Sequence, residues 1–294
     1  MSDKTERRAD DCADEDGFAL LAVLAFLLLF AALLVPFSSA ARLAALTSHH
    51  SFERNRLAYT AEAINAYIAM KLETDGAWAA TIAGEASGRS CVSGDAIVTL
   101  RILDHAGLID LNVAGLTTIE AGLAALSLTA SQVTDIANGV ILFRSRQSSN
   151  SPTPANSQPE YGFKHAPFED VIELLDFPEM RRFSPEQISE IFTVDSHSAA
   201  VSREFASASL RSHLTDVSGE IRHRLQLSGT YTLATKINSQ GEWATDARIV
   251  VTGDGRQTNR RVSALPLSSI SRRGLSDCGV LLGPDAASWL KEAL

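Results

Sequence analysis

The chain has 294 residues, of which 45% are apolar, and its formal net charge at pH 7 is −9. A chain of this length can bury one sizeable core or two smaller ones. Because binding to nucleic-acid phosphates requires a basic face, the acidic balance argues against a nucleic-acid partner.

The first element is an apolar run over residues 18–37, which contains no charged side chain. About 20 helical residues, each rising 1.5 Å, cover roughly 30 Å, the thickness of the hydrocarbon of a bilayer. A buried helix of a soluble protein usually keeps a polar stripe, and this run has none. The sequence therefore predicts a transmembrane helix, which we extend to residues 18–41, and a single-pass membrane protein.

Two other interpretations of the run stay open. A secretory signal peptide has an apolar region of about 7–15 residues behind a basic start, whereas this run is longer and follows acidic residues. Ser38-Ser39-Ala40 would nevertheless suit a signal peptidase. A plain signal anchor is the second alternative, because basic residues flank the run on both sides and do not settle its orientation.

The helix is expected to continue over residues 42–75, because a single apolar stripe follows the run. Its members are spaced four, three, four and four residues apart, as on one face of a helix. Pro36 would kink this long helix, and Asp75-Gly76 is a suitable end for it. The stripe consists of Leu57, Ala61, Ile64, Ile68 and Leu72.

A loop and two short strands are predicted next. Residues 77–95 are rich in glycine, alanine and serine, which indicates a loop. Residues 97–103 alternate as a strand does, with Val98, Leu100 and Ile102 on one face. Asp104-His105-Ala106-Gly107 then forms a turn, and a second strand begins in residues 108–111.

Two helical pairs follow, over residues 112–146 and 168–194. Helix N-caps are expected at Thr129 or Ser131 in the first pair and at Ser184 in the second. Residues 147–159 are rich in proline, serine and asparagine, and they predict a loop between the pairs.

The last third of the chain returns to strands. Residues 224–233 alternate and residues 247–252 are apolar, with hairpin-like turns at Asn238-Ser239-Gln240-Gly241 and Gly253-Asp254-Gly255. We expect an antiparallel meander that forms one sheet with the strands near residues 97–111 and is interrupted by an inserted helical domain. Beyond Ser269 the only clear signal is an amphipathic end over residues 286–294.

The chain has three cysteines, Cys12, Cys91 and Cys278. An odd number usually leaves one thiol unpaired. If the chain were cut between Cys12 and the apolar run, Cys91 and Cys278 would remain and could form a disulfide in an oxidising compartment.

The sequence contains no catalytic motif that we would assign, so we expect a protein that is not an enzyme. His49, His50 and Glu53 are metal-ligand types, but we expect them on the outer face of a helix. A DNA-binding helix–hairpin–helix is the alternative of another class. The hairpin of such proteins presents bare glycine amides to phosphates, whereas residues 126–130 contain no glycine, which favours a structural hairpin.

Several short segments, taken in the order of the chain, resemble the sequences of known families. Gly17-Phe18 followed by an apolar helix resembles the leader junction of type IV prepilins. The remaining phrases resemble the minor pseudopilin K family of type II secretion systems. They are Tyr59-Thr60-Ala61-Glu62-Ala63 and the segments at residues 104–114, 161–175 and 191–196.

The resemblance implies an α+β fold, in which a pilin-like long N-terminal helix packs on an antiparallel sheet with a large all-α domain inserted into the sheet. A prepilin peptidase would cut after Gly17 and methylate the new amino terminus at Phe18. Pilins carry a glutamate where this chain has Ala22, and the K family characteristically lacks it. The family implies a subunit held in the bacterial inner membrane with its bulk in the periplasm. It would sit at the tip of the pseudopilus above the minor pseudopilins I and J.

This interpretation divides the chain into six parts. They are a leader (1–17), a transmembrane helix (18–41), its periplasmic continuation (42–75), a β domain (76–111 and 215–270), an inserted helical domain (112–214) and a tail (271–294). Two alternatives are a signal-anchored periplasmic scaffold or binding protein and a minor pilin of a type IV pilus.

We assign no cofactor and no metal. Some members of the family bind calcium near residues 144–161, but here that segment offers Glu160 as its single acid, and calcium requires several oxygen ligands.

Overall fold

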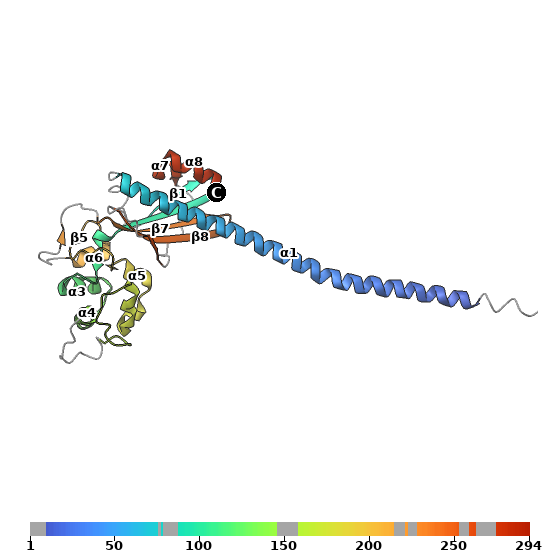
Figure 1. Ribbon diagram of the computed structural model, residues 1–294, viewed down its shortest axis with the longest axis horizontal. Helices are drawn as coiled ribbons and strands as arrows, with labels where there is room; N and C mark the ends of the chain where they lie inside the picture. The colour runs from blue at the N-terminus through green and yellow to red at the C-terminus, as the bar shows by residue number, and fades with distance from the viewer. Residues whose placement is uncertain are drawn as a thin grey trace, which may run out of the picture. The chain divides into compact units, whose positions relative to one another are not determined.

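The computed structural model describes residues 10–75, 78, 88–145, 158–214, 221–222, 228–252, 259–262 and 275–294. The chain divides into two compact units, Met1–Asn55 and Arg56–Leu294. The helix α1 (Asp10–Thr74) begins in the first unit and ends in the second. Figure 1 shows the elements along the chain.

The first unit is the N-terminal part of α1. Among the described residues, α1 is long and apolar enough to cross a membrane, and its apolar part is not buried by the rest of the chain. The helix is not interrupted at Pro36, whose carbonyl accepts a hydrogen bond from Ser39 Oγ at 2.9 Å. The predicted long apolar helix is therefore present.

In the second unit, the rest of α1 packs on a six-stranded sheet (Figure 1). All five residues of the predicted stripe are buried in this core, so the prediction of one apolar helix face is confirmed. Thr74 ends the helix, one residue before the predicted stop.

The sheet has the strand order β10-β1-β2-β7-β8-β9 and is antiparallel except for β10, which pairs in parallel with β1. Val98, Leu100 and Ile102 of β2 face the same core as α1, as the alternation predicted. The strands are β1 (Arg89–Ser93), β2 (Ala96–Asp104), β7 (Thr230–Ser239), β8 (Glu242–Val251), β9 (Asn259–Arg261) and β10 (Ser276–Asp277).

The predicted turn between β7 and β8 is confirmed. Gln240 and Gly241 both have positive φ angles, 51° and 88°, as a two-residue type I′ turn requires. The turn at Gly253-Asp254-Gly255 and most of the predicted strand at residues 224–229 lie outside the described residues.

A second hydrophobic core is formed by the chain between β2 and β7. The predicted second strand does not join the main sheet. Ile109–Asp110 forms β3, which pairs in parallel with β4 (Phe192–Thr193), so this prediction was wrong. The helices around this core are α3 (Leu116–Ala125), α4 (Ala130–Arg144), α5 (Pro185–Ser189) and α6 (Ala208–His213), and a further strand pair joins β5 (Val201–Ser202) to β6 (Ile221–Arg222).

The second predicted helical pair is shorter and tighter than expected. Residues 171–182 form two 3₁₀ helices, η3 (Val171–Asp176) and η4 (Pro178–Arg182), and not one α-helix. Phe177 precedes a proline, which disfavours the helical conformation, and its extended backbone separates the two turns. Thr129 and Ser184 are the N-caps of α4 and α5, as predicted.

The C-terminal residues form two helices, α7 (Cys278–Leu282) and α8 (Pro284–Ala293). Leu282, Ala286 and Leu290 are buried in the same core as α1 and the sheet. The amphipathic end predicted for residues 286–294 is therefore confirmed, while α7 gave no sequence signal. Figure 1 shows both helices beside the C-terminal part of α1.

Candidate functional site

The N-terminal helix carries the residues predicted for processing. Gly17, Phe18 and Cys12 lie within α1, although their side chains are outside the described part of the chain. Ala22 is exposed, and the large apolar side chains that follow it are exposed as well. In water, so many neighbouring apolar side chains would be unfavourable, and this surface is compatible with a single-pass membrane anchor. Those side chains include Leu24, Phe26, Leu27, Leu29, Phe30 and Leu33.

A buried polar network joins the second half of α1 to the sheet. Asn65 Nδ2 donates to Asp246 Oδ2 at 2.9 Å, and Thr235 Oγ1 donates to Asn65 Oδ1 at 2.6 Å. Arg248 Nε lies 2.6 Å from Asp246 Oδ2, and its guanidinium also pairs with Glu62 at 2.7 Å. Buried polar groups are tolerated only when they are paired. The network therefore fixes one alignment of α1 on the sheet.

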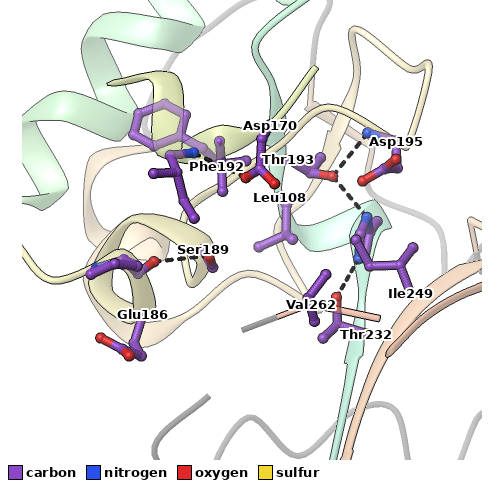
Figure 2. Close-up of a pocket in the computed structure, with 14 residues that line it drawn as sticks. Leu108, Asp170, Glu186, Ser189, Phe192, Thr193, Asp195, Thr232, Ile249 and Val262 are labelled. Atoms are coloured by element: carbon purple, nitrogen blue, oxygen red, sulfur yellow. Dashed lines mark hydrogen bonds between the residues drawn. The ribbon is translucent and has the colours of Figure 1, made fainter. Parts of the chain in front are cut away.

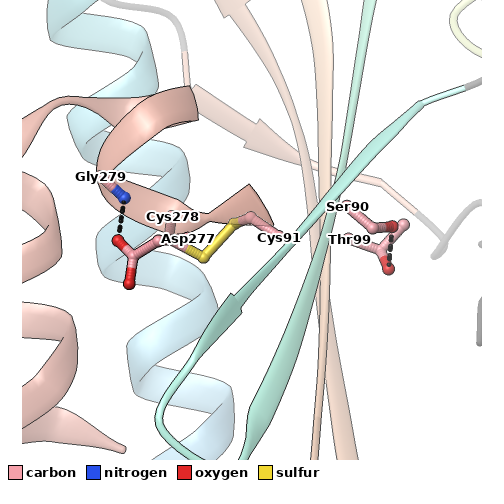
Figure 3. The surroundings of a disulfide bond; sticks show 6 residues. All are labelled: Ser90, Cys91, Thr99, Asp277, Cys278 and Gly279. Atoms are coloured by element: carbon pink, nitrogen blue, oxygen red, sulfur yellow. Dashed lines mark hydrogen bonds between the residues drawn. A yellow bond between two sulfur atoms is a disulfide. The ribbon is translucent and has the colours of Figure 1, made fainter. Parts of the chain in front are cut away.

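A disulfide joins β1 to the C-terminal helices. Cys91 Sγ and Cys278 Sγ are bonded at 2.05 Å, across a sequence separation of 187 residues. Figure 3 shows Cys278 at the start of α7 reaching Cys91 on β1. Both cysteines are buried, at 0% and 1% exposure.

Where the chain leaves the main sheet at the end of β2, the buried carboxylate of Asp104 accepts several hydrogen bonds. Asp104 Oδ1 accepts from Ala106 N at 2.7 Å and from Ser228 Oγ at 2.5 Å. Burial raises the pKa of Asp104, and the hydrogen bonds from Ser228 and Ala106 partly oppose that rise. Burial also raises the pKa of the Tyr231 hydroxyl, and the nearby Asp104 carboxylate adds to the effect.

His105 bridges the two cores. Its Nδ1 lies 2.8 Å from Thr193 Oγ1 of β4, and its Nε2 lies 2.7 Å from Thr232 Oγ1 of β7. The imidazole is 2% exposed, and hydroxyls can donate or accept, so both ring nitrogens are satisfied in the neutral form. His105 belongs to the 3₁₀ helix η1 (His105–Gly107), at the predicted turn. A Cβ on Gly107 would lie 2.3 Å from the backbone of Phe205, so only glycine fits there.

A cleft of about 60 Å³ lies beside this bridge. Figure 2 shows Leu108 in the middle of the cleft, with Asp170, Thr193 and Asp195 on one side of it and Thr232, Ile249 and Val262 on the other. Its walls come from the main sheet, from η3 and from α5. The polar lining includes Asp170, Glu186, Ser189 and Asp195, and the apolar lining includes Leu108, Val171, Ile172, Phe192, Ile249 and Val262.

The segment at residues 104–114 continues into the second core, where its polar side chains make hydrogen bonds to neighbouring loops. Asp110 Oδ2 accepts from His197 N at 2.8 Å and Oδ1 from Asn112 N at 2.8 Å. Asn112 exchanges two hydrogen bonds with the backbone of Phe168, at 2.7 and 3.0 Å. Arg144 donates to the carbonyls of Leu111 and Ala114. Through these hydrogen bonds Asp110, Asn112 and Arg144 hold neighbouring loops together.

Metal-binding groups do not gather in the part of the chain that the structure describes. No set of three or more histidine, cysteine or acidic side chains is positioned to hold an ion there. Glu160 pairs with Arg181, and most of the loop in which calcium was considered, residues 146–157, lies outside the described residues. His49 and His50 lie on the exposed surface of α1, as expected.

The hairpin considered for DNA binding packs inward. Leu126 and Leu128 are buried in the second core, and Ser127, with a φ of 62°, is the exposed residue between them. The contacts that sequence reasoning missed are Asn65 with Asp246, His105 with Thr232, and Asp104 with Ser228. Each joins residues that are far apart in the sequence, so no local pattern marks them.

A solved structure has the same fold. The chain is similar to a chain in the crystal structure of the GspK–GspI–GspJ complex from the Type 2 Secretion System of enterotoxigenic Escherichia coli. The TM-score is 0.51 and the identity 11%, covering 74% of this chain and 99% of that one. The predicted α+β, pilin-like fold class is therefore confirmed. No protein-family model matches the chain, and neither does any curated protein.

Proposed function

We propose that the chain is a minor pseudopilin of the K type, a non-enzymatic subunit at the tip of the pseudopilus of a type II secretion system. The observation that carries the proposal is the shared fold with a chain of the GspK–GspI–GspJ complex over almost the whole of that chain. The unburied apolar helix that leads into the sheet supports it, because a filament subunit stored in a membrane needs such a helix.

In this function the parts of the chain have distinct tasks. A prepilin peptidase removes residues 1–17 and methylates Phe18, and residues 18–41 anchor the subunit in the inner membrane. The sheet and the second core, which we assign to residues 112–214 as an insertion, lie in the periplasm. Minor pseudopilins I and J are the partners, by analogy with the neighbour's complex. The inserted core makes this subunit bulky, which suits a position at the tip of the pseudopilus, where no other subunit follows above it.

The mature amino terminus tests this proposal. Intact mass and N-terminal sequencing of the chain extracted from membranes should give a start at Phe18 with one added methyl group. Gly17→Ala should block the cut and leave Met1 in place, whereas the matched change Ala22→Leu should be processed normally.

Two outcomes would contradict the proposal. An intact Met1 in the wild type would favour a signal-anchored scaffold, and a start near Ala41 would favour a cleaved signal peptide. Co-purification with I-type and J-type pseudopilins tests the partners separately. A chain that starts at Phe18 but binds neither would favour a subunit of another type IV filament.

A further inference from the structure

The cleft beside the His105 bridge lies between the main sheet and the second core. Thr232 of β7 and Ile249 of β8 are paired across the two strands and form its sheet wall. The residues that follow them, Leu233 and Val250, are buried in the core that contains α1. Because successive residues of a strand point to opposite faces, Thr232 and Ile249 face away from α1. The other walls come from β4, η3 and α5, so an occupant of the cleft would contact both layers.

The size and walls of the cleft suit a short apolar chain. One water needs about 10–15 Å³ of such a cavity, so 60 Å³ has room for roughly four to six groups of that size. Ile172 is 37% exposed, so the apolar wall reaches the solvent there. The apolar side chains of the lining are those of Leu108, Val171, Ile172, Phe192, Ile249 and Val262.

The charges around these apolar walls are all negative. Asp170, Glu186 and Asp195 line the cleft and are half-buried, and they lie around Leu108 in Figure 2. Among the described residues of the lining, none is a lysine or an arginine. His105 uses both ring nitrogens in hydrogen bonds to threonines. A cleft lined by charges of one sign, with walls of low dielectric, attracts the opposite charge. The cleft therefore favours a cation that carries an apolar stem.

The interface between α5 and the sheet already contains one cation. Arg101 of β2 pairs with Glu190, which directly follows α5, at 3.0 Å, and the arginine side chain is 10% exposed. Glu186 lies four residues earlier, about one helical turn along the same helix, where it lines the cleft. The sheet thus supplies a cation to the Glu190 end of α5, and the cleft at its Glu186 end can receive one from another molecule.

We propose that the cleft receives a lysine side chain from a segment of a partner protein. Lysine has a flexible four-carbon stem and a compact ammonium, about five groups in all, which matches the room in the cleft. The stem packs along the apolar walls and the ammonium reaches the carboxylates, as amphipathic side chains do at partly buried sites. The main chain of the segment stays outside, where Ile172 is exposed. This binding site goes beyond the proposed function and does not depend on it.

The test uses the full chain in detergent, with isotope-labelled isoleucine and valine methyl groups observed by NMR. The probe is the peptide acetyl-Ala-Lys-Ala-amide, which should shift the methyl signals of Ile172, Ile249 and Val262 in a saturable way. The same peptide acetylated on the lysine side chain keeps the stem but loses the charge, so it should bind at least about tenfold more weakly. Equal binding of the two peptides would overturn the proposal.

A free amine is the other source of the same chemistry. The n-butylammonium ion has the stem and the charge of lysine but no main chain, so it should bind several-fold more weakly than the peptide. If it binds as tightly, the site serves a free amine and the assignment to a protein segment is wrong.

Two variants of the chain locate the site. Glu186→Gln should weaken the binding of the peptide by about threefold, the effect of one partly exposed ion pair. Glu204→Gln is the matched control, because Glu204 is an exposed acid outside the lining and the change in net charge is the same. It should leave the affinity unchanged. Equal weakening by both changes would show a general effect of charge and would contradict the site.

A third variant tests an arginine of the chain itself as the occupant. Arg260 of β9 is paired in register with Ile249. Arg260→Gln should leave the binding of the peptide as it is in the wild type, and binding seen only in this variant would overturn the proposal. The outcomes also separate the two proposals. A start at Phe18 without binding of the peptide overturns the lysine site alone, whereas binding with an intact Met1 overturns the pseudopilin proposal alone.

Discussion

Asn65 of α1 and Asp246 of β8 are hydrogen-bonded to each other inside the second unit, through the side chain and the carbonyl of Asp246 at 2.9 and 3.0 Å. They are 0% and 6% exposed. Apolar packing alone tolerates small shifts of a helix along a sheet, but a shift here would leave both polar groups buried without partners. This contact therefore specifies the alignment of α1 more strictly than the surrounding apolar residues do.

Replacing Asn65 with leucine should weaken the fold. The change removes the donor to Asp246 and the acceptor for Thr235, and each buried polar group left unpaired costs about 1–3 kcal/mol. We expect the free energy of unfolding to fall by about 2–4 kcal/mol, measured by urea denaturation in detergent. Tyr59→Leu, on the exposed side of the same helix, should change it by less than about 0.5 kcal/mol. Equal stability of the two variants would contradict the role of Asn65.

Asp104 should make the stability depend on pH. Burial raises its pKa in the folded chain above the unfolded value of about 3.9, so folding takes up a proton between these two values. The contribution of Asp104 to the free energy of unfolding is therefore largest below about pH 4. It falls as the pH rises through this window, by at most about 1.4 kcal/mol per pH unit.

The matched variant for this prediction is Asp104→Asn, which keeps an acceptor oxygen but does not titrate. Urea denaturation from pH 4 to 8 should show that the difference in unfolding free energy, wild type minus variant, decreases toward higher pH. A difference that increases with pH would show that the hydrogen bonds from Ser228 and Ala106 outweigh burial.

His105→Phe should loosen the connection between the two cores. Phenylalanine fills the space of the imidazole but leaves the buried hydroxyls of Thr193 and Thr232 without their shared partner. We expect a loss of about 1–3 kcal/mol. Amide exchange should rise in β4 and β7 near these threonines and should not rise in α3 and α4. His49→Phe, on the surface of α1, is the control, and equal effects of the two changes would refute the bridge.

Ala22→Glu tests the proposed place at the tip. A charged side chain inside a membrane helix is unfavourable unless it is paired, by up to about 2.5–3.5 kcal/mol at the centre of the helix. A subunit at the tip has no further subunit above it, so no neighbouring subunit there can pair with the new carboxylate. We expect the variant to be cut at Gly17 as usual but to enter the complex with its partner pseudopilins less well than Ala22→Leu does, as measured by co-purification. Improved incorporation would contradict the tip position.

Periodic patterns predicted the parts of the fold that depend on local chemistry. The stripe from Leu57 to Leu72 reports directly which helix face is buried, and Gln240-Gly241 has the residue types that a tight hairpin requires. Ser184 was recognised because its cap is formed within four residues. The apolar run at residues 18–37 was recognised from its composition, whereas the start of α1 at Asp10, ahead of that run, was not predicted.

Contacts between residues that are far apart in the sequence could not be predicted from it. Ile109 and Asp110 were predicted in a strand of the main sheet, but their partner strand is Phe192–Thr193, and only the packing of the second core selects it. Asn65 interrupts no pattern, and its partners are 170 and 181 residues away. The 3₁₀ turns before and after Phe177 depend on Pro178, which disfavours the helical conformation at the residue that precedes it.

The hydrogen bond between Asp104 and Ser228 joins the two points at which the chain leaves and re-enters the main sheet, 124 positions apart in sequence. Because these ends touch, the whole intervening core could be replaced by a short turn without changing the course of β2 or β7. The second core is therefore joined to the main sheet at the open end of the β2–β7 pair, and the register of these two strands does not depend on what lies between them in the sequence.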